Sequence, residues 1–308
     1  MTILVTGGTG FVGTNLIKRL EEKDYSFASF SSKDYNLLKQ QHVEYLLNTT
    51  EPDTIIHLAA SVGGIGANQK NPAKFMFDNL CMGMNLIDGA YRHGSCKHFI
   101  MLGTVCSYPK FTPVPFRESD IWNGYPEETN APYGIAKKTL AELGFAYDRQ
   151  YGFEFSNLVP TNLYGPHDNF DLESSHVIPA IIRKVEQAKR EGSDSITLWG
   201  TGQASRDFLF VDDLVDALVS AVELPLPPEP INIGSGKEVK ICELSKIIAK
   251  KMNYDGEIVY NSDRPDGQPR RCLDISKAKY FLDFEPKTSL DKGLDKTIEY
   301  AEHHIFER

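Results

Sequence analysis

Short apolar runs alternate with longer helical patterns along the first half of the chain. The runs that predict β-strands cover residues 3–5, 27–30, 54–58, 98–102 and 155–159. Between them, the spacing of apolar positions predicts helices that include residues 11–22, 73–93 and 133–151. A strand and helix alternation of this kind is typical of parallel strands joined by helical crossovers. The pattern therefore predicts an α/β fold with a doubly wound parallel sheet.

Beyond residue 165 the alternation becomes irregular. The pattern predicts helices near residues 175–191, 212–223, 241–252 and 289–303, and strands at 196–199 and 207–210. We expect a cofactor-binding domain over residues 1–165 and a smaller mixed α/β substrate lobe mainly over 166–308, with the chain returning to the first domain near 205–235. Ligands of open α/β sheets bind beyond the carboxyl ends of the strands, so the active site is expected between the two lobes.

The composition excludes several classes of protein. The chain has 308 residues and a net charge of −9, which argues against a nucleic-acid partner because such partners are bound through clustered Lys and Arg. The N-terminus lacks the basic region of a signal peptide, and no apolar stretch is long enough to span a membrane. The five cysteines include no C-x-x-C pair, which argues against disulfides and a zinc site. We expect a cytoplasmic protein without a metal or a membrane partner.

A glycine-rich turn directly follows the first predicted strand. It reads Gly7-Gly8-Thr9-Gly10-Phe11-Val12-Gly13 and opens the first predicted helix. Glycines there permit a tight turn, a close approach of the backbone to a pyrophosphate, and close packing of helix on strand. The turn predicts a dinucleotide site in a Rossmann-type sheet, and its spacing resembles that of the extended short-chain dehydrogenases/reductases.

The end of the second strand indicates which dinucleotide binds. NAD sites usually carry an Asp or Glu there, which holds the ribose 2′-hydroxyl. This chain has Ser31, Ser32 and Lys33 instead, and two hydroxyls with an ammonium suit a 2′-phosphate. We therefore expect NADPH, with a solvated polar turn as the alternative because Asp34 follows.

Two Tyr-x-x-x-Lys pairs occur, and position distinguishes them. A tyrosine can protonate a developing alkoxide when a nearby cation lowers its pKa, and residues four apart share one helix face. We interpret Tyr35 and Lys39 as an ordinary exposed helix pair. Tyr133 and Lys137 follow Pro132, which can set a helix start, and they come after the strand whose end carries Thr104. The second pair is therefore the catalytic candidate.

Several longer blocks resemble the GDP-L-fucose synthase family, in order along almost the whole chain. They are residues 57–68, Cys106 with Tyr108-Pro109, and residues 160–170, 176–179, 199–202 and 263–267. The resemblance implies epimerisation of GDP-4-keto-6-deoxy-D-mannose at C3 and C5, followed by NADPH-dependent reduction at C4. A C4 ketone acidifies both neighbouring carbons, so one base and one acid on opposite faces of the ring can invert both centres.

The resemblance also implies a role for individual residues. Cys106 would be the base and His176 the acid of epimerisation, while Tyr133 and Lys137 serve the hydride step and Thr104 holds the carbonyl oxygen. A homodimer through the helices at 73–93 and 133–151 is implied as well. Further cofactor contacts are expected from Leu58, Ala59, Ala60, Pro160, Asn162, Leu163 and His176. Substrate contacts are expected from Asn162, Arg183, Lys184, Trp199, Arg206, Arg264 and Asp266.

Two of these substrate residues have a clear chemical rationale. Arg206 and Arg264 are candidates for the GDP diphosphate, because a guanidinium offers a planar fork of donors to phosphate oxygens. Surface salt bridges are the competing interpretation for both side chains.

Departures from the family pattern keep the substrate open. Thr104 stands where the family usually has Ser and adds a methyl group near the hydride path, and Val105 and Ser107 also differ. The rival hypothesis is a 4-keto reductase of a related GDP-6-deoxy-hexose or heptose that does not epimerise its substrate. More distant alternatives are a 4-epimerase or dehydratase that retains NAD, and a non-catalytic nucleotide-sensing binding protein that keeps the fold.

Overall fold

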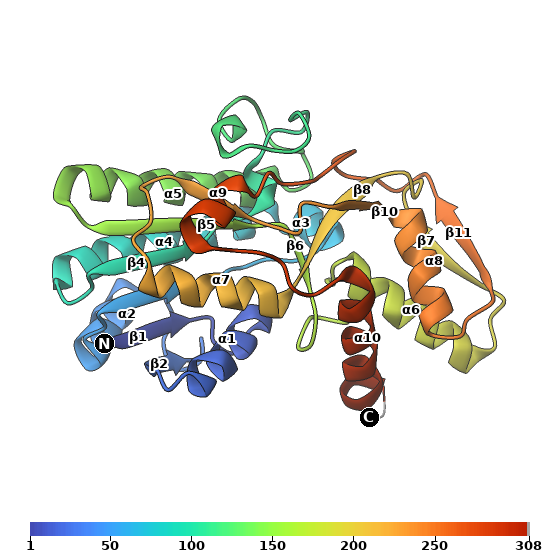
Figure 1. The fold of residues 1–308 in the computed structure, drawn as a ribbon, viewed down its shortest axis with the longest axis horizontal. Helices are drawn as coiled ribbons and strands as arrows, with labels where there is room; N and C mark the ends of the chain where they lie inside the picture. The colour runs from blue at the N-terminus through green and yellow to red at the C-terminus, as the bar shows by residue number, and fades with distance from the viewer. Residues whose placement is uncertain (307–308) are drawn as a thin grey trace.

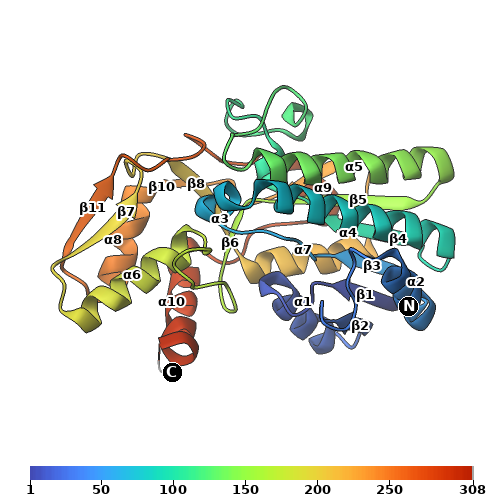
Figure 2. The same cartoon turned by 180° about the vertical axis from the view of Figure 1, so that it is seen from behind.

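A parallel six-stranded sheet forms the centre of the computed structural model, which describes residues 1–306 (Figures 1 and 2). The strand order is β2-β1-β3-β4-β5-β9, and each neighbouring pair is parallel. The strands are β1 (Thr2–Thr6), β2 (Ser26–Phe30), β3 (Thr54–His57), β4 (His98–Leu102), β5 (Glu154–Pro160) and β9 (Pro230–Ile233). The predicted doubly wound α/β fold is confirmed.

Helices cover both faces of this sheet, because successive side chains of each strand point to opposite faces. Ile3 and Val5 of β1 belong to a core with α1 (Phe11–Glu22) and α7 (Val211–Glu223). Leu4, between them, belongs to a second core on the other face. That face is covered by α2 (Gln40–Thr50), α4 (Pro72–His93) and α5 (Ala131–Tyr151), whose buried apolar residues belong to this second core.

Two small sheets build the other end of the molecule, to the right in Figure 1. One has the order β10-β8-β6 and the other pairs β11 with β7. Their strands are β6 (Asn162–Tyr164), β7 (Ser195–Trp199), β8 (Ser205–Phe210), β10 (Glu238–Lys240) and β11 (Glu257–Asn261). The helices packed with them are α6 (Val177–Glu191), α8 (Ile241–Lys251) and α10 (Leu290–Ala301), which share a third core. Shorter elements are α3 (Ile65–Lys70), α9 (Ser276–Leu282), η1 (Val105–Ser107), η2 (Glu118–Asp120) and η3 (Glu302–Phe306).

The named strands and helices predicted from the sequence are all present, with ends shifted by a few residues. The prediction lacked the short strands β6, β9, β10 and β11 and the helices α2, α3 and α9. The chain does return to the main sheet after the small sheets begin, because β9 pairs with β5 and α7 packs against α1. The domain boundary at residue 165 stays a prediction. Within residues 1–306, no helix combines the length and the apolar character needed to cross a membrane.

The interpretation of Tyr35 and Lys39 as a helix pair is wrong. The segment after β2 is a turn, in which the Asp34 carboxylate accepts hydrogen bonds from the Ser31 backbone N–H (3.1 Å) and hydroxyl (2.6 Å). Lys39 only caps the start of α2, and Tyr35 packs its ring edge-on against Phe30. A carboxylate that binds nearby backbone groups favours a turn over a helix, which explains the difference.

Candidate active site

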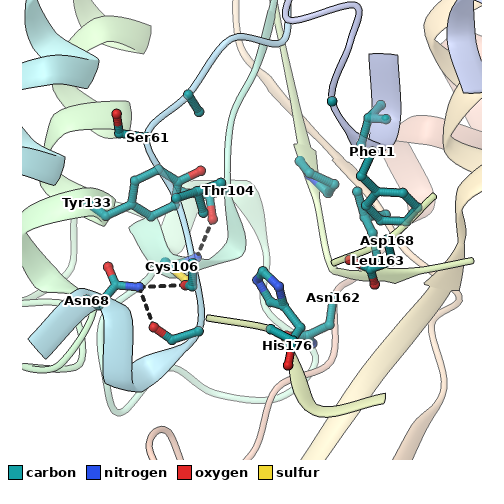
Figure 3. Close-up of a pocket in the computed structure, with 18 of the residues that line it drawn as sticks. Phe11, Ser61, Asn68, Thr104, Cys106, Tyr133, Asn162, Leu163, Asp168 and His176 are labelled. Atoms are coloured by element: carbon teal, nitrogen blue, oxygen red, sulfur yellow. Dashed lines mark hydrogen bonds between the residues drawn. The ribbon is translucent and has the colours of Figure 1, made fainter. Parts of the chain in front are cut away.

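A cavity of about 860 Å³ lies beyond the carboxyl ends of β1, β3, β4 and β5 and extends to the small sheets. Parallel strands bring their carboxyl ends to one edge of a sheet, so segments far apart in the sequence meet there. Gly7, Leu58 and Thr104, which follow β1, β3 and β4, and Pro160 at the end of β5 line the cavity, and α6 contributes residues near its start. Figure 3 shows part of this cavity.

The glycine-rich turn lies at one end of the cavity. Gly7 has a φ of +75°, and a Cβ there would lie 2.6 Å from the Ala59 nitrogen. A Cβ on Gly13 would lie 2.2 Å from the Gly7 oxygen, so helix α1 can approach β1 only without a side chain at this position. Gly10 caps α1 without a side-chain hydrogen bond, and the N–H groups of a first helical turn are natural anion donors. Thr9, Gly10, Phe11, Val12, Ala59 and Ala60 line the cavity beside them.

The predicted 2′-phosphate residues are only partly at this cavity. Ser32 lines it, whereas Ser31 and Lys33 do not. Ser31 is turned away because both its N–H and its hydroxyl bind Asp34, and Lys33 is exposed to solvent. Tyr35, absent from the predicted site, lines the cavity here. Tyr35 reaches the cavity because the segment after β2 is a turn, where the sequence predicted a helix.

Tyr133 and Lys137 lie on the first turns of α5 and are both buried at the cavity. Burial lowers the pKa of Lys137 to about 8, and its ammonium donates a hydrogen bond to the Leu102 oxygen at 3.0 Å. Burial also raises the pKa of Tyr133, as does the nearby Cys106, while a hydrogen bond with Thr104 opposes this shift. The sequence argument expected the lysine to lower the tyrosine pKa, but burial dominates. The phenol therefore keeps its proton at neutral pH and can donate it.

Thr104 and Cys106 follow β4 and face the same part of the cavity (Figure 3). The Thr104 hydroxyl accepts a hydrogen bond from the Cys106 backbone N–H at 3.2 Å and so caps the short turn η1. A Cβ on Gly134 would lie 2.1 Å from the Cys106 oxygen. The glycine after Tyr133 thus allows α5 to approach this turn and brings the phenol, hydroxyl and thiol together.

His176 reaches the cavity from the other lobe, as the capping residue of α6. Figure 3 shows its ring in the space between Cys106 and Leu163. The imidazole is exposed to the interior of the cavity but surrounded by protein, and this desolvation lowers its pKa, with a smaller contribution from the Arg271 charge. A lowered pKa makes the protonated imidazole a stronger acid, so His176 in its protonated form gives up its proton readily to a ligand.

Two buried guanidinium groups line the substrate end. Arg206 donates to the backbone oxygens of Ser205 (2.7 Å) and Asp266 (2.8 Å). Arg271 donates to the side-chain oxygens of Gln268 (3.1 Å) and Asn162 (3.2 Å). None of these acceptors carries a charge, and burial together with Arg271 lowers the pKa of Arg206 to about 9. Two buried cations whose hydrogen-bond partners are neutral are suited to a diphosphate.

Some of the remaining predicted substrate residues line the cavity and others lie outside it. Lys184, Trp199 and Asp266 line the cavity with Asn162, although the Asp266 carboxylate is bound by the Thr201 N–H and hydroxyl, each at 2.8 Å. Arg183 and Arg264 do not line the cavity, contrary to the prediction. Arg183 lies over the Phe306 ring at 5.4 Å, and Arg264 is exposed and lies over the Trp199 ring at 4.9 Å. Their aromatic partners hold both guanidinium groups outside.

Sequence reasoning missed Arg271 and Asp168. Arg271 follows the block at residues 263–267, but its neighbour Arg270 has the same side chain and forms an exposed salt bridge with Glu238, so the sequence offers no signal to choose between them. Asp168 is buried at the cavity with its Oδ2 atom unpaired, and burial raises the pKa of this carboxyl to about 7. Asp168 lies within the block at residues 160–170, in which the sequence pointed to Pro160, Asn162 and Leu163 but not to this carboxylate.

We expect Arg271→Ala to raise KM for a GDP-sugar by about 10- to 100-fold, because a hydrogen bond to a charged group contributes roughly 1.5–3 kcal/mol. Arg270→Ala is the matched control and should leave KM within about twofold, since an exposed ion pair contributes little. Initial rates over a range of substrate concentrations measure both. Equal effects of the two variants would contradict the assignment of Arg271.

The chain is similar to known proteins over nearly its whole length. The model of the NAD dependent epimerase/dehydratase family matches residues 3–234. The GDP-L-fucose synthase of Sinorhizobium fredii is 42% identical over 96% of this chain and 94% of its own. Similar solved structures include a GDP-L-fucose synthetase from Naegleria fowleri bound to NADP, with a TM-score of 0.89 and 27% identity over 99% of this chain and 95% of that chain.

Another similar structure is a GDP-6-OMe-4-keto-L-xylo-heptose reductase from C. jejuni, with a TM-score of 0.91 and 26% identity over 98% of this chain and 97% of that chain. It shares the fold over nearly the whole length, whereas the higher sequence identity is to the fucose synthase of S. fredii. The resemblance inferred from the sequence blocks is thereby confirmed: the chain belongs to the NAD dependent epimerase/dehydratase family and, within it, to the GDP-L-fucose synthases.

Proposed function

We propose that the protein converts GDP-4-keto-6-deoxy-D-mannose to GDP-L-fucose, by epimerisation at C3 and C5 and NADPH-dependent reduction at C4. The observation that carries this proposal is that the residues for epimerisation and the residues for reduction line the same cavity. Cys106 and His176 reach it from different lobes, and Tyr133 with Thr104 lies beside Cys106. The names of the relatives support the substrate, since the S. fredii protein at 42% identity is a GDP-L-fucose synthase.

In the epimerisation, Cys106 takes the proton from the carbon next to the C4 ketone, and the electron pair moves onto the carbonyl oxygen. His176 then returns a proton to the same carbon from the opposite face, as the electron pair moves back. The two residues lie on different sides of the cavity, as this inversion requires (Figure 3). Each carbon that is inverted in this way takes its new hydrogen from the exchangeable protons of the enzyme and solvent.

In the reduction, Tyr133 donates its proton to the C4 oxygen as negative charge develops there, and Thr104 holds this oxygen by its hydroxyl. NADPH supplies the hydride to C4 when bound. The Lys137 ammonium, held by the Leu102 oxygen, lies one helical turn from Tyr133 and favours the phenolate that remains. The glycine-rich turn would hold the pyrophosphate, with Ser32 and Tyr35 at the adenosine end.

Turnover in D₂O with GDP-4-keto-6-deoxy-D-mannose tests this function. We expect deuterium at C3 and C5 of the product and one NADPH oxidised for each product molecule. Mass spectrometry counts the deuterium, and NADPH absorbance follows the reduction. NADPH oxidation without deuterium incorporation would contradict the epimerase assignment, and no oxidation above background would favour a non-catalytic binding protein.

A reductase that does not epimerise a GDP-6-deoxy-hexose or heptose is the second candidate. The similarity to the C. jejuni heptose reductase, with a TM-score of 0.91, favours it, as does Thr104 at the carbonyl-holding position. The same experiment decides, because such an enzyme would oxidise NADPH with a suitable GDP-4-keto sugar and incorporate no solvent deuterium.

We propose that the protein is a cytoplasmic homodimer. All five cysteines are free, which is typical of a reducing compartment.

On helix α4, Phe77 and Met84 are 63% and 43% exposed and lie two turns apart on one side. Exposed apolar side chains on one face support contact with a second copy through α4 and α5. Sedimentation at several concentrations tests the predicted dimer, and a monomer at all of them would exclude it.

A further inference from the structure

The segment between β3 and α4 crosses from the main sheet to the other lobe. We call residues 61–68 the strap; most of them line the cavity. At one end, the Ser61 backbone exchanges hydrogen bonds with the Asn79 side chain of α4, with the Ser61 N–H donating at 3.2 Å and the Ser61 oxygen accepting at 2.8 Å. At the other lobe, the Gly64 N–H donates to the Ser174 oxygen at 3.0 Å. This bond reaches the chain two residues before His176.

The side chain of Asn68 fixes the conformation of the strap. It is only 3% exposed, and its Nδ2 atom donates to the oxygens of Gly63 (2.7 Å) and Gly64 (3.1 Å). Both hydrogen bonds are drawn in Figure 3, where Asn68 lies on the same side as Cys106. One buried amide thus sets the orientation of the peptide groups after Gly63 and after Gly64, and the first of these carries the N–H that binds Ser174.

No side chain separates the strap from the residues before His176. A Cβ on Gly64 would lie 2.4 Å from the Ser175 oxygen, and a Cβ on Gly63 would lie 3.4 Å from the Ser174 oxygen. The two backbones are therefore in direct contact. A displacement of the strap is transmitted to Ser175 and to the adjacent His176 without a flexible side chain that could absorb it.

The turn that precedes His176 is stabilised mainly by its own hydrogen bonds. The Asp171 carboxylate accepts from the Ser174 hydroxyl at 2.8 Å, and the Asp171 oxygen accepts from the Ser175 N–H at 2.9 Å. Such a turn moves as a unit. Its hydrogen bond to Gly64 connects this unit to the strap, and through Ser61 to the part of the molecule that carries Cys106.

We propose that Asn68 is a positioning residue for epimerisation: it holds the strap so that Gly64 fixes His176 opposite Cys106. This inference rests on the proposed function, in which these two side chains transfer protons to and from the sugar. Proton transfer requires hydrogen-bond reach, so a small displacement of His176 is costly to that step. The hydride step depends instead on Tyr133 and Thr104, both carried by the main-sheet layer.

The test compares two variants of Asn68 with the control variant Asn71→Ala. Asn68→Ala removes the side-chain amide, and Asn68→Asp removes the donor at nearly constant volume. Asn71 is a matched control because its Nδ2 also donates to a backbone oxygen, that of Ala67 at 3.2 Å, but it is outside the cavity lining. Each enzyme is given GDP-4-keto-6-deoxy-D-mannose in D₂O and, separately, the same ketone already inverted at C3 and C5. We expect deuterium exchange to fall by about 100-fold in both Asn68 variants, since misplacement by about 1 Å can have an effect of this size.

Reduction of the inverted ketone should stay within about twofold of wild type in every variant, because this step needs no proton from His176. A loss of both activities together, or of neither, overturns the proposal. Wild-type enzyme that reduces the ketone but exchanges no deuterium would instead overturn the proposed epimerase function. Gly64→Ala is an independent variant should Asn68→Ala not fold, and the same selective loss of exchange is expected from it.

Discussion

Replacing Tyr133 with Phe should lower kcat for NADPH-dependent reduction by roughly 10²- to 10⁴-fold, the usual contribution of a positioned general acid. The phenol is buried, keeps its proton at neutral pH and is hydrogen-bonded to Thr104, so the variant removes the donor without changing the shape of the site. Deuterium exchange at C3 and C5 should continue, because Cys106 and His176 remain. NADPH absorbance and product mass measure the two steps separately.

Tyr164→Phe is the matched control for this variant. Tyr164 is also almost fully buried, and its hydroxyl forms only a long hydrogen bond of 3.5 Å to the Leu290 oxygen, away from the cavity. Its reduction rate should remain close to that of the wild type. If Tyr133→Phe reduced the ketone as fast as Tyr164→Phe, another group would have to protonate the C4 oxygen, and the assignment of Tyr133 would be wrong.

Replacing Cys106 with Ser should impair epimerisation and spare reduction, the reverse of the effect of Tyr133→Phe. A serine hydroxyl is far harder to deprotonate than a thiol, so we expect deuterium exchange to fall by about 10²- to 10⁴-fold, the range for loss of a general base. Reduction of a ketone already inverted at C3 and C5 should persist, since Tyr133, Thr104 and Lys137 are unchanged. Exchange is followed by mass spectrometry in D₂O and reduction by NADPH absorbance.

Cys81→Ser controls for the loss of a thiol elsewhere. Cys81 lies on α4, is half-buried and does not line the cavity, so its replacement should leave exchange intact. Undiminished exchange in Cys106→Ser would assign the base to a different side chain. Together with the tyrosine variant, this measurement separates the two chemistries that the single cavity is proposed to carry.

Local features of the site could be predicted from the sequence because they depend on a few neighbouring residues. The strand, turn and helix around Gly7, Gly10 and Gly13 follow from backbone conformations and close approaches that only glycine permits there. The two Tyr-x-x-x-Lys pairs show the limit of such reasoning. The pair at Tyr133 is helical, but Asp34 converts the segment around Tyr35 into a turn.

The anion-binding residues depended on packing between distant segments. Arg206 is on β8 and Arg271 follows β11, and both become buried at the cavity through contacts with Asp266, Gln268 and Asn162. The exposed Arg264 was an equally good candidate in the sequence. Contacts between distant segments decide which guanidinium group lines the cavity. Arg264 lies over the Trp199 ring and does not line the cavity.

The sequence by itself determined the parallel α/β fold, the dinucleotide loop, the positions of Thr104 and Tyr133, and the family. These follow from hydrophobic periodicity and from short motifs whose physical requirements lie within a few residues. Only the tertiary structure decided that burial raises the pKa of Tyr133, that Arg271 joins Arg206, and that the strap contacts the residues before His176. Burial and contacts between lobes are properties of the whole packed chain, and no local pattern encodes them.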